Sequence, residues 1–238
     1  MKKKEKIIGL LGGMGPEATI DLYSKIVKLT VAKKDQEHLR IIIDNNPKVP
    51  DRSLAILKGG ISPLNTLQKS AQNLEKAGVD FIIMPCNTAH YYTSSIKSVL
   101  NIPVLNMIKE TAKEINTIEP KIKKVGLLVT DGTIKTKLYL RELDKYSIKI
   151  VLPEEEEQKL VMLSIYNLKA GNLTKENKKS MIKVVNNLIR QGAEAIIAGC
   201  TEVPLLLENE KLSVTEIDST LILAKASILY ACGEIKNI

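Results

Sequence analysis

Two of the three cysteines stand where they could move protons. Cys86 and Cys200 each follow a short apolar run, Phe81–Pro85 in one case and Ala195–Ala198 in the other. Each is followed by hydrogen-bonding residues, in the sequences CNTAH and CTEVP. One thiolate could remove a proton from one face of a carbon atom while one thiol supplies a proton to the other face. This matched pair is what racemisation requires, whereas a single buried cysteine is more often a small apolar side chain.

Alternating strands and helices would position these cysteines. The pattern predicts an α/β fold with parallel sheets. Because ligands bind at the carboxyl ends of such strands, both thiols should point toward one crevice, each followed by a helix N-terminus that lowers its pKa. The expected strands are 6–11, 40–44, 81–85, 104–105, 125–130, 148–152, 195–198 and 214–217, and the expected helices 17–31, 63–77, 91–99, 134–145, 155–169, 175–190, 203–207 and 219–232.

The chain also resembles two copies of one unit. Residues 74–86 match residues 188–200 in the order helix, glycine, strand and cysteine, and Ile8–Leu11 matches Val125–Leu128. This internal repeat predicts two similar lobes, each a parallel sheet flanked by helices, with the active site in the crevice between them. We expect the first lobe at residues 1–110, the second at 111–218, and the C-terminal helix 219–238 packed back on the first.

Composition narrows the function classes. The chain has 238 residues, 44% hydrophobic and 26% charged, which is typical of a folded protein. Its net charge of +8 comes from scattered lysines, and with one Phe and no Trp it offers no base-stacking motif, so we expect no nucleic-acid partner. No apolar run reaches the length of a membrane span, and we expect no membrane association and a cytoplasmic location. An odd cysteine count there favours reduced thiols.

Cofactor motifs are weak. The glycine-rich turn at residues 9–15 follows a strand but does not match the dinucleotide-binding spacing, so a turn that approaches the substrate or simply allows close packing is favoured. Two histidines without ligand spacing predict no metal site. His90 could tune Cys86, although a polar role in the first helical turn is the simpler interpretation, and Cys232 is expected to be a packing residue. We expect no cofactor.

Five segments carry a resemblance to a known family. They are IGLLGGMGPEAT (8–19), NNPKVPDRS (45–53), MPCNTAHYY (84–92), KAGNL (169–173) and AGCTEVPLLL (198–207). Together they resemble the pyridoxal-independent aspartate racemases of the aspartate/glutamate racemase family, over nearly the whole chain. The resemblance implies an isomerase with two α/β lobes, a homodimer, no cofactor, and Cys86 and Cys200 as the acid/base pair.

The resemblance also implies a set of substrate contacts. Arg52 and Lys169 would bind the carboxylates of a small dicarboxylic amino acid, although the segment before Lys169 is one residue shorter than the family pattern. Fixed cations suit this role because removing an α-proton builds negative charge beside the carboxylate. The full set of candidate substrate-binding residues is Met14, Asp51, Arg52, Asn87, Thr88, Ala89, Thr130, Lys169 and Thr201.

Several other functions stay open. A glutamate, hydantoin or other amino-acid racemase, a maleate isomerase, or a decarboxylase of malonates could share this fold. Two cysteines favour proton transfer at two faces, and the Gly-Gly-Met-Gly turn favours aspartate, because the resemblance gives glutamate racemases an acidic-Ser-Gly turn. The alternative outside enzymes is a two-lobed protein that closes on an anionic ligand, which fold alone does not exclude.

Overall fold

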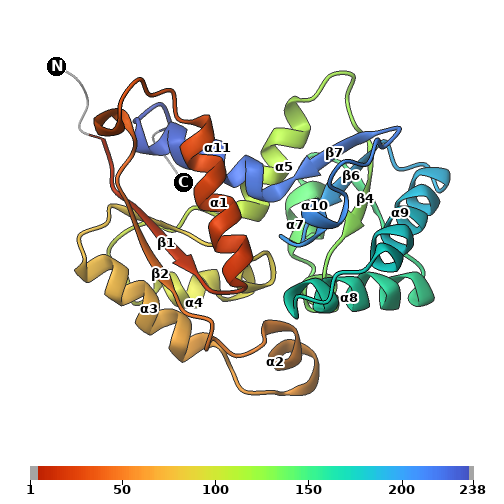
Figure 1. The fold of residues 1–238 in the computed structure, drawn as a ribbon, viewed down its shortest axis with the longest axis horizontal. Helices are drawn as coiled ribbons and strands as arrows, with labels where there is room; N and C mark the ends of the chain where they lie inside the picture. The colour runs from red at the N-terminus through yellow and green to blue at the C-terminus, as the bar shows by residue number, and fades with distance from the viewer. Residues whose placement is uncertain (1–4, 236–238) are drawn as a thin grey trace. The chain divides into compact units, whose positions relative to one another are not determined.

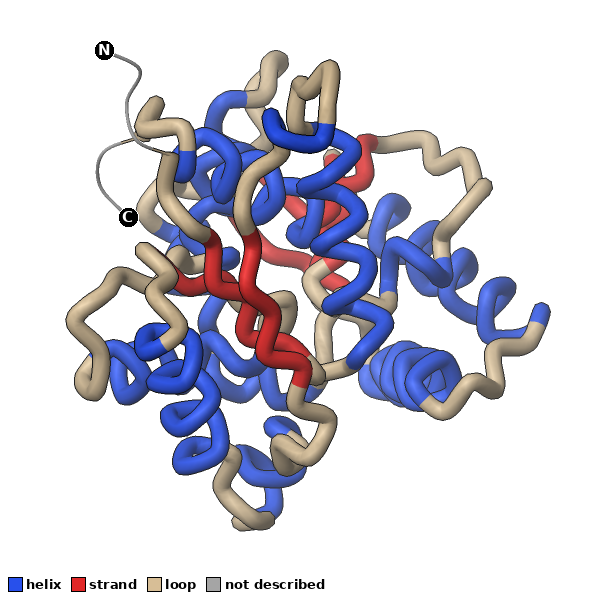
Figure 2. The backbone as a smooth tube through the Cα atoms, turned by 60° about the vertical axis from the view of Figure 1, so that its left-hand side comes forward, coloured by secondary structure: helices blue, strands red, loops and turns tan. Residues whose placement is uncertain are grey.

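A computed structural model describes residues 5–235, and they form two compact units. The first unit contains residues 5–110 and 220–235, and the second contains residues 111–219. Both are α/β units built on parallel sheets (Figures 1 and 2), so the predicted fold class is confirmed. The last three residues of the predicted C-terminal helix lie outside the described residues.

The first unit is built on a three-stranded parallel sheet. Its strand order is β2-β1-β3, with β1 (Ile8–Gly12), β2 (Ile41–Asn45) and β3 (Phe81–Ile83). Helices α1 (Pro16–Leu29) and α11 (Ser219–Ala231) pack their apolar residues on one face of this sheet, and α3 (Leu64–Lys76) packs on the other (Figure 1). The shorter helices are η1 (Asp35–Glu37), α2 (Arg52–Lys58), η2 (Thr88–Tyr92) and α4 (Thr93–Lys97).

The second unit repeats this plan with one added strand. Its order is β5-β4-β6-β7, with β4 (Lys124–Leu128), β5 (Lys149–Val151), β6 (Ala195–Ala198) and β7 (Thr215–Asp218). One core cluster joins its sheet to α8 (Glu155–Lys169), α9 (Lys175–Arg190) and α10 (Val203–Leu206). The remaining helices are α6 (Asp131–Thr136), α7 (Leu138–Asp144) and α5 (Met107–Thr117), of which α5 begins in the first unit.

Matched glycines let each central strand pack closely. A Cβ at Gly9 of β1 would lie 2.8 Å from Val79 Cγ2, and one at Gly126 of β4 would lie 2.6 Å from Ile196 Cδ1. Real Cβ atoms do not approach this closely, so a side chain at either position would force its neighbour to shift. The repeat seen in the sequence thus corresponds to a close contact at the same place in each unit, at a glycine of its central strand.

Local differences from the sequence prediction have physical causes. The predicted strand at 104–105 is only a single bridge, between Ile82 and Val104. The predicted helix 134–145 is two helices, since Lys137 adopts a left-handed conformation (φ 55°) that interrupts the helical backbone. Helices α2 and α5 were not predicted. Within residues 5–235, no helix is both long enough and apolar enough to cross a bilayer.

Candidate active site

Cys86 lies directly beyond β3, in a loop tied down by a buried histidine. The Met107 N–H donates to Nε2 of His90 (3.0 Å), so the ring proton is on Nδ1, which donates to the Cys86 carbonyl (2.9 Å). Burial lowers the pKa of His90 from 6.5 to about 4, although carbonyl hydrogen bonds oppose the shift. His90 is therefore neutral near pH 7 and anchors the Cys86 loop to the start of α5.

The polar residues after Cys86 are buried with it. Asn87, Thr88 and Ala89 open the 3-10 helix η2 and are no more than 6% exposed. Cys86 itself is a buried free thiol. The hydrogen-bonding side chains of Asn87 and Thr88 are therefore buried in the loop that carries Cys86, beyond the carboxyl end of β3.

Arg52 links two loops of the first unit. Its Nη1 donates to the carbonyls of Val49 (3.3 Å) and Pro50 (3.1 Å), and its Nη2 donates to the carbonyl of Met14 (3.1 Å). Asp51 caps α2 by accepting from the Leu54 N–H (2.8 Å). Arg52, Asp51 and Met14 are thus brought together, and Arg52 is nearly buried in spite of its charge.

Cys200 lies directly beyond β6, in contact with a carboxylate. Its S–H donates to Glu202 Oε2 (2.9 Å), and the Thr201 hydroxyl donates to the same oxygen (3.1 Å). The Lys169 Nζ, at the end of α8, lies 3.5 Å from Glu202 Oε1. The structure therefore brings Cys200, Thr201 and Lys169 together through a residue that was not among the predicted site residues.

The predicted lowering of the thiol pKa by a helix N-terminus is wrong for Cys200. Burial and then the Glu202 carboxylate raise its pKa well above 9, and Lys169 opposes them only in part. The helix that follows, α10, has four residues and therefore little dipole to offer. Cys200 is consequently a protonated thiol at neutral pH.

The buried side chain of Tyr139 packs close to Gly199, the residue before Cys200. The Tyr139 hydroxyl hydrogen-bonds with Ser219 and Thr111, and burial raises its pKa. A Cβ at Gly199 would lie 3.1 Å from Tyr139 Cε2 and 2.5 Å from Val129 Cγ1. Thr130, which the sequence placed in the site, caps α6, and its hydroxyl hydrogen-bonds with that of Thr133 (3.2 Å) at the carboxyl end of β4.

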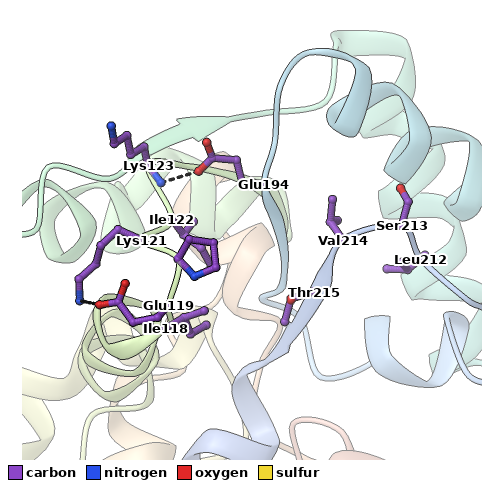
Figure 3. A pocket seen from close by; sticks show the side chains of 11 residues that line it. Ile118, Glu119, Lys121, Ile122, Lys123, Glu194, Leu212, Ser213, Val214 and Thr215 are labelled. Carbon is purple, nitrogen blue, oxygen red and sulfur yellow. Dashed lines mark hydrogen bonds and ion pairs between the residues drawn. The ribbon is translucent and has the colours of Figure 1, made fainter.

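A pocket of about 750 Å³ lies at the opposite end of this sheet (Figure 3). Lys123, Glu194 and Thr215 line it at the starts of β4, β6 and β7. Three of its charged side chains have local partners: Glu194 accepts from the Lys123 N–H (2.6 Å), and Lys121 pairs with Glu119 (2.9 Å). This pocket contains none of the predicted site residues, and the described residues include no cluster of side chains suited to a metal ion.

Comparison with known proteins gives the family. The model of the Asp/Glu/hydantoin racemase family matches residues 11–227. This chain belongs to that family. Membership supports its assignment as an isomerase.

Relatives and solved structures span nearly the whole chain. The broad-specificity amino-acid racemase RacX of Bacillus subtilis is 32% identical over 235 residues, covering 93% of this chain and 96% of RacX. The structure of Picrophilus torridus aspartate racemase is 35% identical, with a TM-score of 0.85 over 95% of this chain and 94% of that one. An aspartate racemase homologue from Pyrococcus horikoshii is 28% identical, with a TM-score of 0.74, covering 95% and 99%.

Two supporting residues escaped the sequence analysis. Glu202 stands two residues after Cys200 inside an otherwise apolar and hydroxyl-bearing motif, and a lone acid in such a setting was the available signal. Tyr139 gave no signal, because its partners Thr111 and Ser219 come from distant parts of the sequence.

Proposed function

We propose that this protein interconverts L- and D-aspartate without pyridoxal phosphate or metal, using Cys86 and Cys200 to exchange the α-proton. One observation carries the proposal. Each unit has a buried free cysteine two or three residues after the corresponding strand, β3 in one sheet and β6 in the other. Racemisation needs a base and an acid on opposite faces of the α-carbon, and two thiols at matching positions of two units meet that need.

The proposed reaction is a two-base proton transfer. A thiolate removes the α-proton, and the second thiol donates its proton to the opposite face of the carbanion. Negative charge builds beside the substrate carboxylate during this step, so fixed donors and cations would stabilise it. In this proposal Arg52 and Lys169 bind carboxylates, while Asn87, Thr88 and Thr201 hold the α-carboxylate and amino group, beside Met14, Asp51, Ala89 and Thr130.

Aspartate is supported by the 35% identity to an aspartate racemase over most of both chains. A broader substrate range is the second candidate, and it has its own support. Lys169 lies 3.5 Å from the Glu202 carboxylate, so part of its charge is already balanced within the protein. RacX, at 32% identity, is described as a broad-specificity enzyme. The homodimer and the cytoplasmic location expected from the sequence stay predictions.

One experiment tests the activity and its substrate. Purified protein, dialysed against a chelator and hydroxylamine to remove metal and pyridoxal phosphate, is incubated in deuterium oxide with L-aspartate, and chiral chromatography follows D-aspartate. The product should carry α-deuterium from its first appearance, because the donating thiol exchanges with solvent. Parallel reactions with L-glutamate and with uncharged amino acids separate the two candidates. Activity that returns only when a cofactor is added would contradict the proposal.

A further inference from the structure

The carboxylate of Glu202 makes the two cysteines chemically different. Its Oε2 accepts hydrogen bonds from Cys200 and Thr201, and its Oε1 faces Lys169. The Glu202 side chain is only 5% exposed. In the first unit, the position two residues after Cys86 is Thr88, which brings no charge. A buried carboxylate is therefore in direct contact with one thiol through a contact that the other loop does not repeat.

This contact favours the protonated form of Cys200. An ionised carboxylate only accepts hydrogen bonds, so it stabilises the S–H form, whereas a thiolate would face a negative charge about 3 Å away. Burial acts in the same direction, and the Lys169 cation opposes both. Tyr139 of α7 interacts electrostatically with Cys200 and with Asp218 of β7, and neither Tyr139 nor Asp218 supplies a positive charge.

We propose that Glu202 is a positioning residue that holds Cys200 as the acid in the resting enzyme, so that Cys86 starts as the base. The proposal rests on the two-thiol function above. In the first turnover the substrate Cα–H bond breaks and its proton passes to the Cys86 thiolate. The Cys200 S–H then gives its proton to the opposite face of the carbanion. One thiolate exists before and after, now on Cys200 beside Glu202, and proton exchange with solvent restores the resting form.

The consequence for kinetics is specific. The two enantiomers have equal free energies, so kcat/KM is the same in both directions for every variant and at every pH. The asymmetry therefore appears in KM and kcat separately. The enantiomer that Cys86 deprotonates binds the dominant resting form. The other enantiomer binds only the minor form, so its apparent KM is raised by the reciprocal of the small fraction in which that form is present. Its kcat is raised by the same factor.

Thiol alkylation tests the contact without relying on racemase activity. Full-length protein is treated with iodoacetamide from pH 6 to 10, and peptide mass spectrometry measures the rate at each cysteine. In Glu202→Gln the pH midpoint for Cys200 should fall by roughly one unit or more, because the neighbouring charge is gone. Cys86 is the internal control and should not move. Glu194→Gln is the matched control, since it removes a carboxylate at the other end of the same sheet.

Kinetics on the same variants complete the test. In Glu202→Gln the KM values for L- and D-aspartate should approach each other, whereas Glu202→Asp, which keeps the charge, should retain most of their difference. An unchanged Cys200 midpoint in a folded Glu202→Gln variant overturns this inference even if racemisation is normal. If no amino acid is racemised, the two-thiol function fails, and the alkylation midpoint still decides whether Glu202 holds the Cys200 proton.

Discussion

The two cysteine loops occupy equivalent places in two similar units, yet they are stabilised differently. In the first unit, Cys86 is preceded by Pro85 and followed four residues later by the neutral, buried His90, which bonds to backbone groups on both sides. In the second unit, Gly199 precedes Cys200, and Pro204 stands where His90 would be. There the buried polar group is Glu202, which bonds to the thiol itself.

In the proposed mechanism, this difference gives different roles to two identical side chains in a repeated fold. The first loop is fixed through its backbone, and the thiol has no charged residue among the four that follow it. The second loop brings a carboxylate and a lysine to the thiol. The shared strand order places a thiol at the same point of each unit, and the few residues after each strand make the surroundings of the two thiols different.

Replacing each cysteine in turn is the strongest way to break the comparison. Cys86→Ala and Cys200→Ala should each lower aspartate racemisation by roughly 10²–10⁴-fold, the usual contribution of one acid or base. The fold should survive, because a buried thiol and a methyl differ little in volume. Each variant should still exchange the α-proton of one enantiomer with deuterium oxide, with opposite preferences, as followed by proton NMR.

Cys232→Ala is the matched control for both variants. Cys232 is half-buried against the core of the first unit and lies outside both loops. The Cys232→Ala variant should racemise aspartate and exchange its α-proton with deuterium oxide as the wild type does. Near-normal racemisation by Cys86→Ala or Cys200→Ala would contradict the two-thiol mechanism.

The first loop contains a buried histidine, His90, where the second loop has Pro204, so only the first loop should make stability depend on pH through this position. The pKa of His90 is about 4 in the folded protein and near 6.5 in the unfolded chain. As the pH falls, the unfolded chain therefore binds a proton at His90 before the folded protein does. Stability from this group is therefore present above pH 6.5 and is lost as the pH falls toward 4. The loss is about 3 kcal/mol at 1.36 kcal/mol per pKa unit.

His90→Gln should remove this pH dependence. The variant should be less stable than the wild type at pH 7, because two buried backbone groups lose their partner. The difference in the free energy of unfolding between the wild type and His90→Gln should narrow by about 3 kcal/mol between pH 7 and pH 4. Urea unfolding monitored by circular dichroism measures it. Parallel pH curves for the two proteins would show that His90 is not the neutral buried group described above.

The fold class followed from the sequence because it depends on local and repeated signals. Apolar runs such as Phe81–Ile83 gave buried strands, and the repeat gave two units with the same order of their first three strands. Helix α9 agrees with its predicted bounds because Thr174 caps it and an apolar stripe runs along it. Helix α2 was missed, since it is short and starts with a charged residue inside a proline-containing loop.

The surroundings of the candidate site residues were predictable only in part. The cysteines could be found because their strands and following residues repeat, whereas the partners of each thiol depend on contacts between distant segments. Lys169 reaches Glu202 from the end of α8, and Arg52 reaches the Met14 carbonyl from another loop. Sequence patterns give no distance for such pairs, so the raised pKa of Cys200 could not be foreseen.

The two loops also differ in the residue before the cysteine, which is Pro85 in the first and Gly199 in the second. Pro85 fits in the first loop, whereas any side chain at Gly199 would meet Val129 Cγ1 at 2.5 Å and Tyr139 Cε2 at 3.1 Å. Val129 is fully buried, and its branched side chain has little freedom to move away. Gly199→Ala should therefore lower the free energy of unfolding by about 1–3 kcal/mol through overpacking.

A double-mutant cycle identifies the cause of that loss. Val129→Ala removes the methyl group in closest contact, so the loss in Gly199→Ala/Val129→Ala should be smaller than the two single losses added together, by roughly 0.5–3 kcal/mol. Val161→Ala, a buried valine of α8, is the control and should add to Gly199→Ala without coupling. Urea unfolding of the six proteins measures every term. Strict additivity with Val129→Ala would mean that the glycine is kept at this position for a reason other than its contact with Val129.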